Sequence, residues 1–410
     1  MLEIQRSHIG EITVLDISGR IDGINSGLLQ DAIDHVIEEG NGRDLLLKMT
    51  KVNYISASGL RVLRELQSKT GVVRIVEPAV RVAEVMQITG LDVVYELYNT
   101  LTEALHTTEP VVNAHTHLEL GWLNFGLPDI NGEDFVPWIR KAILEPFQNL
   151  PYDWKQQFTD SIKSGIQVLV DSGVTTVADI SETGMSIEPL LNARLRGIVY
   201  IEVSGTSPEK ADERYHHMVD IVEHWLPRMR NDLRLGIAPH TPYSLSRELW
   251  AKVLNYAREK NLPLCIHVAE SPAETQYLKD GTGDLASYFP GREFTPPGKS
   301  PVAYLEELGA LELKPLLVHA VQVSDADIAL IKKYGCTVVH CPRSNLRLRC
   351  GRMPLEKFIA ADIPVLIGTD SLVSTPSLDV FDEIEFASAL HYDKVSPQEL
   401  VNMVHRNLPL

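Results

Sequence analysis

Four histidines and two acidic residues follow short apolar segments in the later part of this 410-residue chain. An isolated histidine after an apolar run is usually a hydrogen-bonded core residue. Ionisable residues that follow several buried segments in turn need another explanation, because a purely structural protein gains nothing from placing them there. Neutral imidazoles and a carboxylate that converge on one point can bind a transition metal. The pattern predicts a metal-dependent hydrolase. The six residues are His115, His117, His267, Glu270, His319 and Asp370.

The spacing of these residues predicts a metal site with four ligands. His115 and His117 are two residues apart, so on a strand their side chains point to the same face. With His267 and Asp370 they supply three nitrogens and one oxygen, which leaves room for a water molecule. Zinc suits this set, and iron(II) and manganese are alternatives. A bound metal lowers the pKa of water from about 15.7 towards about 7, which provides a hydroxide nucleophile at neutral pH.

The remaining residues suggest how protons move. Glu270 lies three residues after His267, where it can reach a substrate without binding the metal, so we expect it to shuttle a proton to a ring nitrogen and then to a leaving amine. Asp370 can accept a proton from the metal-bound water, and His319 can hydrogen-bond the nucleophile or the developing oxyanion. His240 has two open interpretations, which are orientation of a neighbouring group and a plain hydrogen bond at the rim.

Eight short apolar segments alternate with helical patterns beyond residue 110, for example the helical stretches 154–172, 246–260 and 325–334. This order predicts an α/β fold, a (β/α)8 TIM barrel, whose site lies at the C-terminal ends of the strands. The predicted strands are 111–112, 174–178, 198–203, 235–238, 262–266, 316–318, 337–339 and 365–367.

A smaller α/β domain of about 100 residues precedes the barrel. Residues 11–18 alternate between apolar and polar side chains, and buried strands are expected at 45–47 and 72–76. The polar segment His106–Pro110 ends in proline and marks a boundary. We therefore predict domains at 1–106 and 110–410.

The first domain resembles the STAS domain of anti-sigma-factor antagonists and sulfate-transporter tails. The resemblance rests on Gly19-Arg20-Ile21-Asp22 and on Tyr54-Ile55-Ser56-Ala57-Ser58-Gly59-Leu60. In that family an aspartate and a phosphorylated serine begin the loop before the helix, whereas this chain has Ser56 and Ala57. Ala57 cannot carry a phosphate, although Ser56 or Ser58 can substitute for it. A regulatory module that binds a protein partner and a simple docking or folding module remain equally open.

The larger domain resembles the amidohydrolase superfamily, and within it the cytosine deaminase and chlorohydrolase-like branch. This resemblance implies the metal ligands and catalytic roles given above. Binuclear members carry a modified lysine where this chain has His240, so the resemblance implies a mononuclear site. The β-sandwich of typical relatives is expected to be absent. The matching motifs lie at 112–119, 238–244, 267–271, 340–345 and 368–371.

The substrate is suggested by three further segments. The Leu118-Glu119 step and residues 270–278 and 377–383 look similar to aminofutalosine deaminases. We therefore expect deamination of an adenine-like ring. The alternatives are hydrolysis of another ring C–N or carbon–halogen bond, and a STAS-linked regulatory pseudo-enzyme that binds a metabolite. The candidate substrate-binding residues are Glu119, Trp122, His240, Arg343 and Ser371, of which Trp122 would stack a base and Arg343 would hold a carboxylate.

Composition limits the partners. Fifty-five acidic against 38 basic residues give a net charge of −17, which disfavours nucleic acid and anionic membranes as partners. The N-terminus has no signal-peptide pattern, and no apolar run approaches the roughly 18 residues of a membrane span. The four cysteines lack the CxxC pairing of a structural zinc site and are expected to be reduced. We expect a cytoplasmic protein that acts on a small molecule, and a homo-oligomer is allowed.

Overall fold

The computed structural model describes residues 2–9, 12–38, 44–66, 72–91, 95–98, 110–124, 134–193, 195–288 and 294–409. The chain divides into two compact units, Met1–Glu109 and Pro110–Leu410. No helix in the described ranges is long and apolar enough to cross a membrane.

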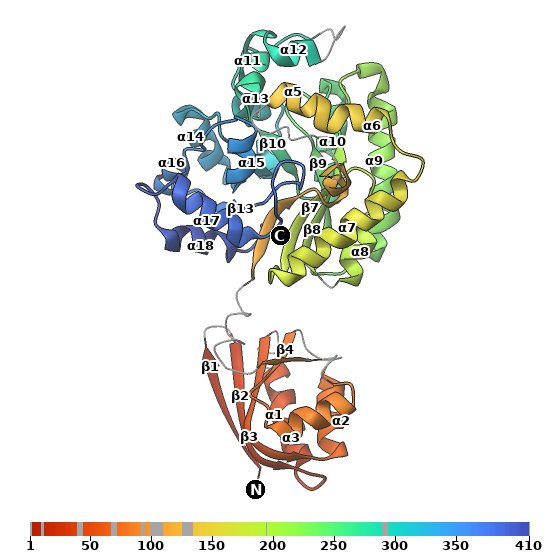
Figure 1. Ribbon diagram of the computed structural model, residues 1–410, viewed down its shortest axis with the longest axis vertical. Coiled ribbons are helices and arrows are strands. Elements are labelled where there is room, and N and C mark those ends of the chain that lie inside the picture. The colour runs from red at the N-terminus through yellow and green to blue at the C-terminus, as the bar shows by residue number, and fades with distance from the viewer. Residues whose placement is uncertain are drawn as a thin grey trace. The chain divides into compact units, whose positions relative to one another are not determined.

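The first unit is a five-stranded sheet with helices packed on it (Figure 1). The order is β1-β2-β3-β4-β5; β1 and β2 are antiparallel and the other neighbours are parallel. Apolar side chains such as Leu15, Ile33 and Leu63 form a buried core between sheet and helices. The elements are β1 (Glu3–Ile9), β2 (Ile12–Ile21), α1 (Ser26–Glu38), β3 (Asp44–Ile55), α2 (Ala57–Leu66), β4 (Val72–Val76), α3 (Val80–Ile88) and β5 (Glu96–Tyr98).

The second unit contains two four-stranded parallel sheets, with orders β6-β7-β8-β9 and β10-β11-β12-β13. Each strand overlaps one of the eight predicted segments. The strands are β6 (Val112–Thr116), β7 (Thr176–Ser181), β8 (Arg196–Val203), β9 (Leu233–Pro239), β10 (Cys265–Val268), β11 (Leu316–His319), β12 (Thr337–His340) and β13 (Val365–Ile367).

Helices connect the parallel strands and surround them (Figure 1). Among the described residues, Arg140–Leu144 forms a π-helical turn, and four short pieces are 3₁₀-helical: Leu118–Asn124 after β6, Pro208–Lys210, Leu226–Arg228 and Leu311–Leu313. The α-helices are α5 (Phe135–Ile139), α6 (Glu145–Gln148), α7 (Trp154–Asp171), α8 (Ile187–Asn192), α9 (Ala211–Trp225), α10 (Arg247–Lys260), α11 (Pro272–Asp280), α12 (Asp284–Tyr288), α13 (Pro301–Glu307), α14 (Asp325–Tyr334), α15 (Pro342–Arg347), α16 (Leu355–Ala360), α17 (Val380–Leu390) and α18 (Pro397–Val404).

Single bridges link the two sheets where they meet. Ile237 on β9 pairs with Leu264, and Thr116 at the end of β6 pairs with Asp370 after β13. The Asp370 N–H donates to the His115 carbonyl over 2.9 Å. The sheets are therefore neighbours at both edges, although they are not one continuously hydrogen-bonded sheet.

Successive residues of the strands enter two different apolar clusters. On β8, Ile198 and Tyr200 pack with the inner cluster between the sheets, while Val199 and Ile201 pack against the helices. This alternation follows from the two-residue period of a strand. Because both faces are buried, these strands read as continuous apolar runs in the sequence. Polar side chains are therefore concentrated at the strand ends.

Candidate active site

Three histidine side chains converge at the ends of β6 and β10. The Nε2 atoms of His115 and His117 are 3.2 Å apart, and those of His117 and His267 are 3.3 Å apart. His115 and His267 complete the triangle at 3.2 Å. Ligand nitrogens about 2.0–2.1 Å from a tetrahedral zinc ion would be separated by about 3.3 Å. The three nitrogens thus have the spacing of a metal-ligand set.

Two of the three histidines, His117 and His267, are neutral, which leaves lone pairs for a cation. Burial, followed by the charge of His115, lowers the pKa of His117 to about 3, and burial also holds the pKa of His267 well below its usual value. The Nδ1 atom of His267 lies 3.1 Å from the His240 carbonyl oxygen, so Nδ1 carries the proton and Nε2 is bare. Three Nε2 atoms in mutual contact cannot all satisfy one another by hydrogen bonds, whereas a divalent cation can bind all three.

Asp370 completes the set with one carboxylate oxygen. Its Oδ1 atom lies 3.6 Å from the Nε2 atoms of both His115 and His117. Its Oδ2 atom accepts hydrogen bonds from the hydroxyls of Ser344 (2.6 Å) and Ser374 (2.9 Å). One oxygen therefore faces the histidines, while the serines hold the other.

Glu270 and His319 face each other beside this set. The Glu270 Oε1 and His319 Nε2 atoms are 3.5 Å apart. Burial, then the charges of Asp370 and Glu274, raise the pKa of Glu270 well above its usual value, which favours the protonated form of its carboxyl group. His319 Nδ1 donates to Asn345 Oδ1 over 2.9 Å. The neutral ring therefore presents Nε2 as an acceptor, which suits contact with a nucleophilic water rather than with an oxyanion.

Comparison with known proteins matches the two units of the chain to two different families. The amidohydrolase family model matches residues 111–406. The chain belongs to the amidohydrolase family. A model of the STAS domain matches residues 3–104.

Named relatives of this amidohydrolase are deaminases. It is 37% identical over 306 residues to the aminodeoxyfutalosine deaminase of Deinococcus radiodurans, covering 71% of this chain and 70% of that protein. It is 26% identical to the 5-methylthioadenosine/S-adenosylhomocysteine deaminase of Carboxydothermus hydrogenoformans, covering 71% of this chain and 63% of that protein. The chain thus spans somewhat less than two thirds of the second relative.

Solved structures share the fold. A zinc-bound adenosine deaminase from Xanthomonas campestris has a TM-score of 0.60 and 23% identity, over 72% of this chain and 65% of that one. The Helicobacter pylori aminofutalosine deaminase in complex with methylthio-coformycin also has a TM-score of 0.60, with 22% identity over 72% and 71% of the two chains.

A cavity of about 610 Å³ opens onto the histidine set of this amidohydrolase. Its lining includes the apolar side chains of Phe135, Trp138 and Phe147. Three of the predicted substrate-binding residues, Glu119, His240 and Ser371, line the cavity, and burial lowers the pKa of His240 to about 4. Neutral His240 can therefore offer a substrate a hydrogen bond without a charge.

Glu119 and the two remaining predicted substrate-binding residues, Trp122 and Arg343, are engaged within the protein. Glu119 reaches the cavity, but its carboxylate accepts hydrogen bonds from the Ser181 hydroxyl and from the turn that follows β7. The buried Trp122 ring packs 5.4 Å from the Phe158 ring. Arg343 forms ion pairs with two acids of α17 and donates to the Asp382 carbonyl. These contacts give each of the three a structural role.

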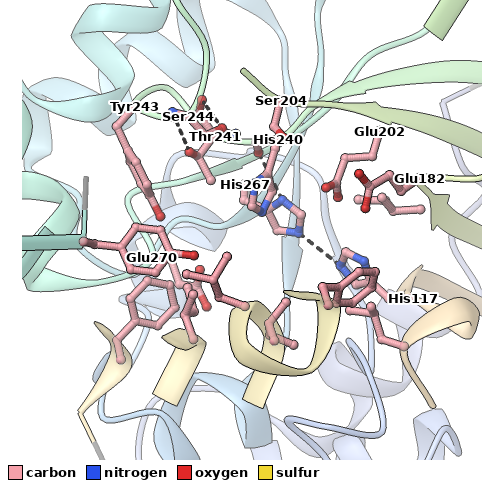
Figure 2. A pocket seen from close by; sticks show the side chains of 18 of the residues that line it. His117, Glu182, Glu202, Ser204, His240, Thr241, Tyr243, Ser244, His267 and Glu270 are labelled. Carbon is pink, nitrogen blue, oxygen red and sulfur yellow. Dashed lines mark hydrogen bonds between the residues drawn. The ribbon is translucent and has the colours of Figure 1, made fainter. Parts of the chain in front are cut away.

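Sequence reasoning missed several polar residues of the cavity. Glu182, Glu202, Ser204 and Tyr243 line it together with the histidines, as Figure 2 shows. Burial raises the pKa of Glu202 to about 8, and burial followed by the charge of Glu202 raises the pKa of Glu182. Both glutamates lie at the ends of β7 and β8, so the strand-end rule that found the histidines was a signal for them too.

Proposed function

We propose that residues 110–410 form a metal-dependent hydrolytic deaminase that acts on an adenine-like ring. The observation that carries this proposal is the meeting of three histidine nitrogens, the Asp370 carboxylate and Glu270, whose pKa is raised, beside one cavity. We further propose that the eight strands close into a (β/α)8 barrel, and that residues 1–106 are a separate STAS-like domain. The bridges at both edges of the two sheets support closure.

We propose zinc as the metal, held by His115, His117, His267 and Asp370. When bound, a divalent ion of this kind supplies a hydroxide nucleophile at neutral pH. Zinc is present in a solved relative of the same fold, and the spacing of the three nitrogens suits it. Iron(II) and manganese remain alternatives.

The protein's own groups move the protons. The raised pKa of Glu270 favours its protonated form, and Glu270 gives this proton to a ring nitrogen, so that the ring carbon bearing the amino group becomes more electrophilic. Asp370 accepts a proton from the attacking water. Glu270, ionised by the first transfer, takes the hydroxyl proton of the resulting adduct and delivers it to the amino group, which leaves as ammonia, and the proton held by Asp370 then returns to Glu270. His319 Nε2 orients the water by accepting a hydrogen bond, because its Nδ1 is committed to Asn345.

The cavity suits a substrate larger than a bare ring. Its volume of about 610 Å³ leaves space for a substituent beyond an adenine-like ring. We propose aminofutalosine or a similar adenine nucleoside, in keeping with the activities for which the relatives are named. His240 and Ser371 would contact the ring, and Glu182 and Glu202 would contact the substituent.

The cellular context is also a proposal. We propose a cytoplasmic enzyme with a small-molecule substrate, and the four cysteines, all buried and unpaired, agree with a reducing compartment. A homo-oligomer and a protein partner of the STAS-like domain are left for experiment.

The test is release of ammonia from adenine-type compounds, including aminofutalosine, by the zinc-loaded protein. We expect turnover of at least one compound by the wild-type protein. Glu270→Gln should bind the same amount of zinc and lose turnover by about 10²- to 10⁴-fold, because the proton donor is removed. Full activity of Glu270→Gln would refute the proton shuttle. Silence across the panel with zinc bound would refute deamination of these rings and favour another hydrolysed bond.

A further inference from the structure

The helix that follows Glu270 carries a second buried glutamate. Glu274 lies in the first turn of α11, and its relative exposure is 1%. The Glu274 side chain does not point to the solvent, and Glu274 is not one of the residues that line the cavity. Burial raises its pKa to about 8. Placing such a group inside a protein is costly, so its contacts should explain it.

Glu274 forms an unusual variant of the capping box. The Ser271 hydroxyl caps α11 by accepting from the Glu274 N–H over 3.3 Å. In a capping box the acid at the third helical position returns to the N–H of the capping residue itself, as Glu399 does to Ser396 at α18. Glu274 instead reaches one residue further back, and its Oε2 atom accepts the Glu270 N–H over 2.8 Å.

The peptide unit between Ala269 and Glu270 is therefore held on both sides. Its carbonyl oxygen accepts hydrogen bonds from the N–H groups of Val321 (2.9 Å) and Gln322 (2.7 Å). Its N–H group is held by Glu274. Ala269 has a φ of +50°, which is unfavourable for a residue other than glycine, so the turn needs such contacts to keep its shape.

We propose that Glu274 is a positioning residue that fixes the backbone of Glu270 and so aims its carboxyl group at the reacting ring. This inference rests on the proposed proton-shuttle role of Glu270. Without Glu274, the peptide unit is anchored only at its carbonyl, and its buried N–H loses its acceptor. A shift of about 1 Å in the proton donor can slow a reaction by about 100-fold.

The first test compares three variants. Glu274→Ala should lower kcat by about 100-fold while the KM and the zinc content change little, because neither the ligands nor the cavity lining is altered. Glu274→Gln keeps an acceptor oxygen and should retain kcat to within about threefold. Glu399→Ala, the matched control, removes a capping acid of α18 and should lower only the Tm. An unchanged kcat in Glu274→Ala would overturn the proposal.

A double-mutant cycle separates positioning from general destabilisation. If Glu274 acts only through Glu270, then Glu274→Ala should cost little further activity in a Glu270→Gln background. If the loss of activity in the double variant equals the product of the two single-variant losses, Glu274 acts by another route and the proposal is overturned.

A readout without turnover keeps this inference distinct from the proposed reaction. Hydrogen exchange at the Glu270 amide should be roughly tenfold or more faster in Glu274→Ala than in wild type, and slow again in Glu274→Gln. Equal exchange rates would overturn the positioning role even if deamination is confirmed. If no substrate is deaminated, the exchange rates still show whether Glu274 holds the Glu270 amide. If Glu274→Ala fails to fold, Glu274→Asp, which is one methylene shorter, takes its place in all three tests with the same expected direction.

Discussion

Glu202 is an acid whose environment favours its neutral form. It lies on β8, and burial raises the pKa of its carboxyl group to about 8, with the Glu119 carboxylate adding to the shift. Burial also raises the pKa of neighbouring Glu182. At neutral pH the folded protein therefore keeps a proton on Glu202 that the unfolded chain releases. A protonated acid beside the cavity can donate as well as accept hydrogen bonds.

This difference in pKa predicts how stability depends on pH. An unfolded glutamate titrates at about 4.3, so between about pH 4.3 and pH 8 the folded state binds more protons and its free energy of unfolding falls as the pH rises. We expect Glu202 to contribute about 2 kcal/mol to this fall, less than the full shift implies, because the cavity admits water. Glu202→Gln should flatten the slope in urea unfolding of metal-free protein between pH 5 and pH 8.5. Parallel profiles for the two proteins would contradict the assignment.

Some individual residues could be predicted from the sequence, and others could not. The histidines and Asp370 were accessible because a polar group at the end of a buried strand has few structural uses. Trp122 and Arg343 have many uses, and a packing tryptophan or an ion-paired arginine looks the same in sequence as one that binds a ligand. Their partners come from α7 and α17, which only the fold brings close. For the same reason Glu274 could not be distinguished from an ordinary solvent-facing helix acid.

A glycine lets two strands approach at the metal site. Gly368 follows β13, and a Cβ atom on it would lie 2.6 Å from the His115 Cβ and 2.9 Å from the His115 backbone nitrogen. Real Cβ atoms are not found that close to backbone, so the strand end must carry glycine. The two sheets are also joined here, because the N–H of Asp370, two residues after Gly368, donates to the His115 carbonyl oxygen.

Gly368→Ala should therefore damage the site through the strand rather than through a ligand. Overpacking of this kind typically costs about 1–3 kcal/mol, and it would push His115 away from His117 and His267. We expect zinc affinity to fall by at least about tenfold, with a lower Tm, as measured by competition with a metal chelator and by thermal unfolding. Gly335→Ala provides a control for strain without crowding, since Gly335 has a positive φ and nothing within 4 Å of its missing Cβ. Wild-type zinc affinity in Gly368→Ala would contradict this account.

At the scale of elements, strands with two buried faces were the easiest to predict. β7, β8 and β9 extend beyond the apolar segments that predicted them, because the hydrogen bonding of the strands continues into polar residues. β1 was not predicted, since Ile4 and Ile9 are the only strongly apolar residues in its seven-residue span. Its edge position needs few buried side chains, so pairing with β2 rather than hydrophobicity determines it.

The whole molecule contains two units with separate cores. Buried residues such as Leu15, Leu47 and Ile75 form the core of the first, and Val199, Trp250 and Phe358 belong to that of the second. Their separation could be predicted from the change of pattern near residue 108, because two cores require two independent sets of apolar periodicities. The single bridges that join the two sheets could not be predicted, because they depend on pairs such as Ile237 and Leu264 that have no sequence signature.

The separation of the cores predicts that catalysis needs only the second unit. Every residue assigned to the metal, the proton path or the cavity lies in Pro110–Leu410. A protein lacking residues 1–109 should therefore bind zinc with the full-length stoichiometry and keep its kcat/KM to within about twofold, since units with their own cores fold independently. Side-by-side kinetics and zinc analysis of the two proteins check this. A folded, zinc-loaded second unit whose kcat/KM is more than about tenfold lower would show that the STAS-like unit acts on the reaction, which is the behaviour expected of a regulatory domain.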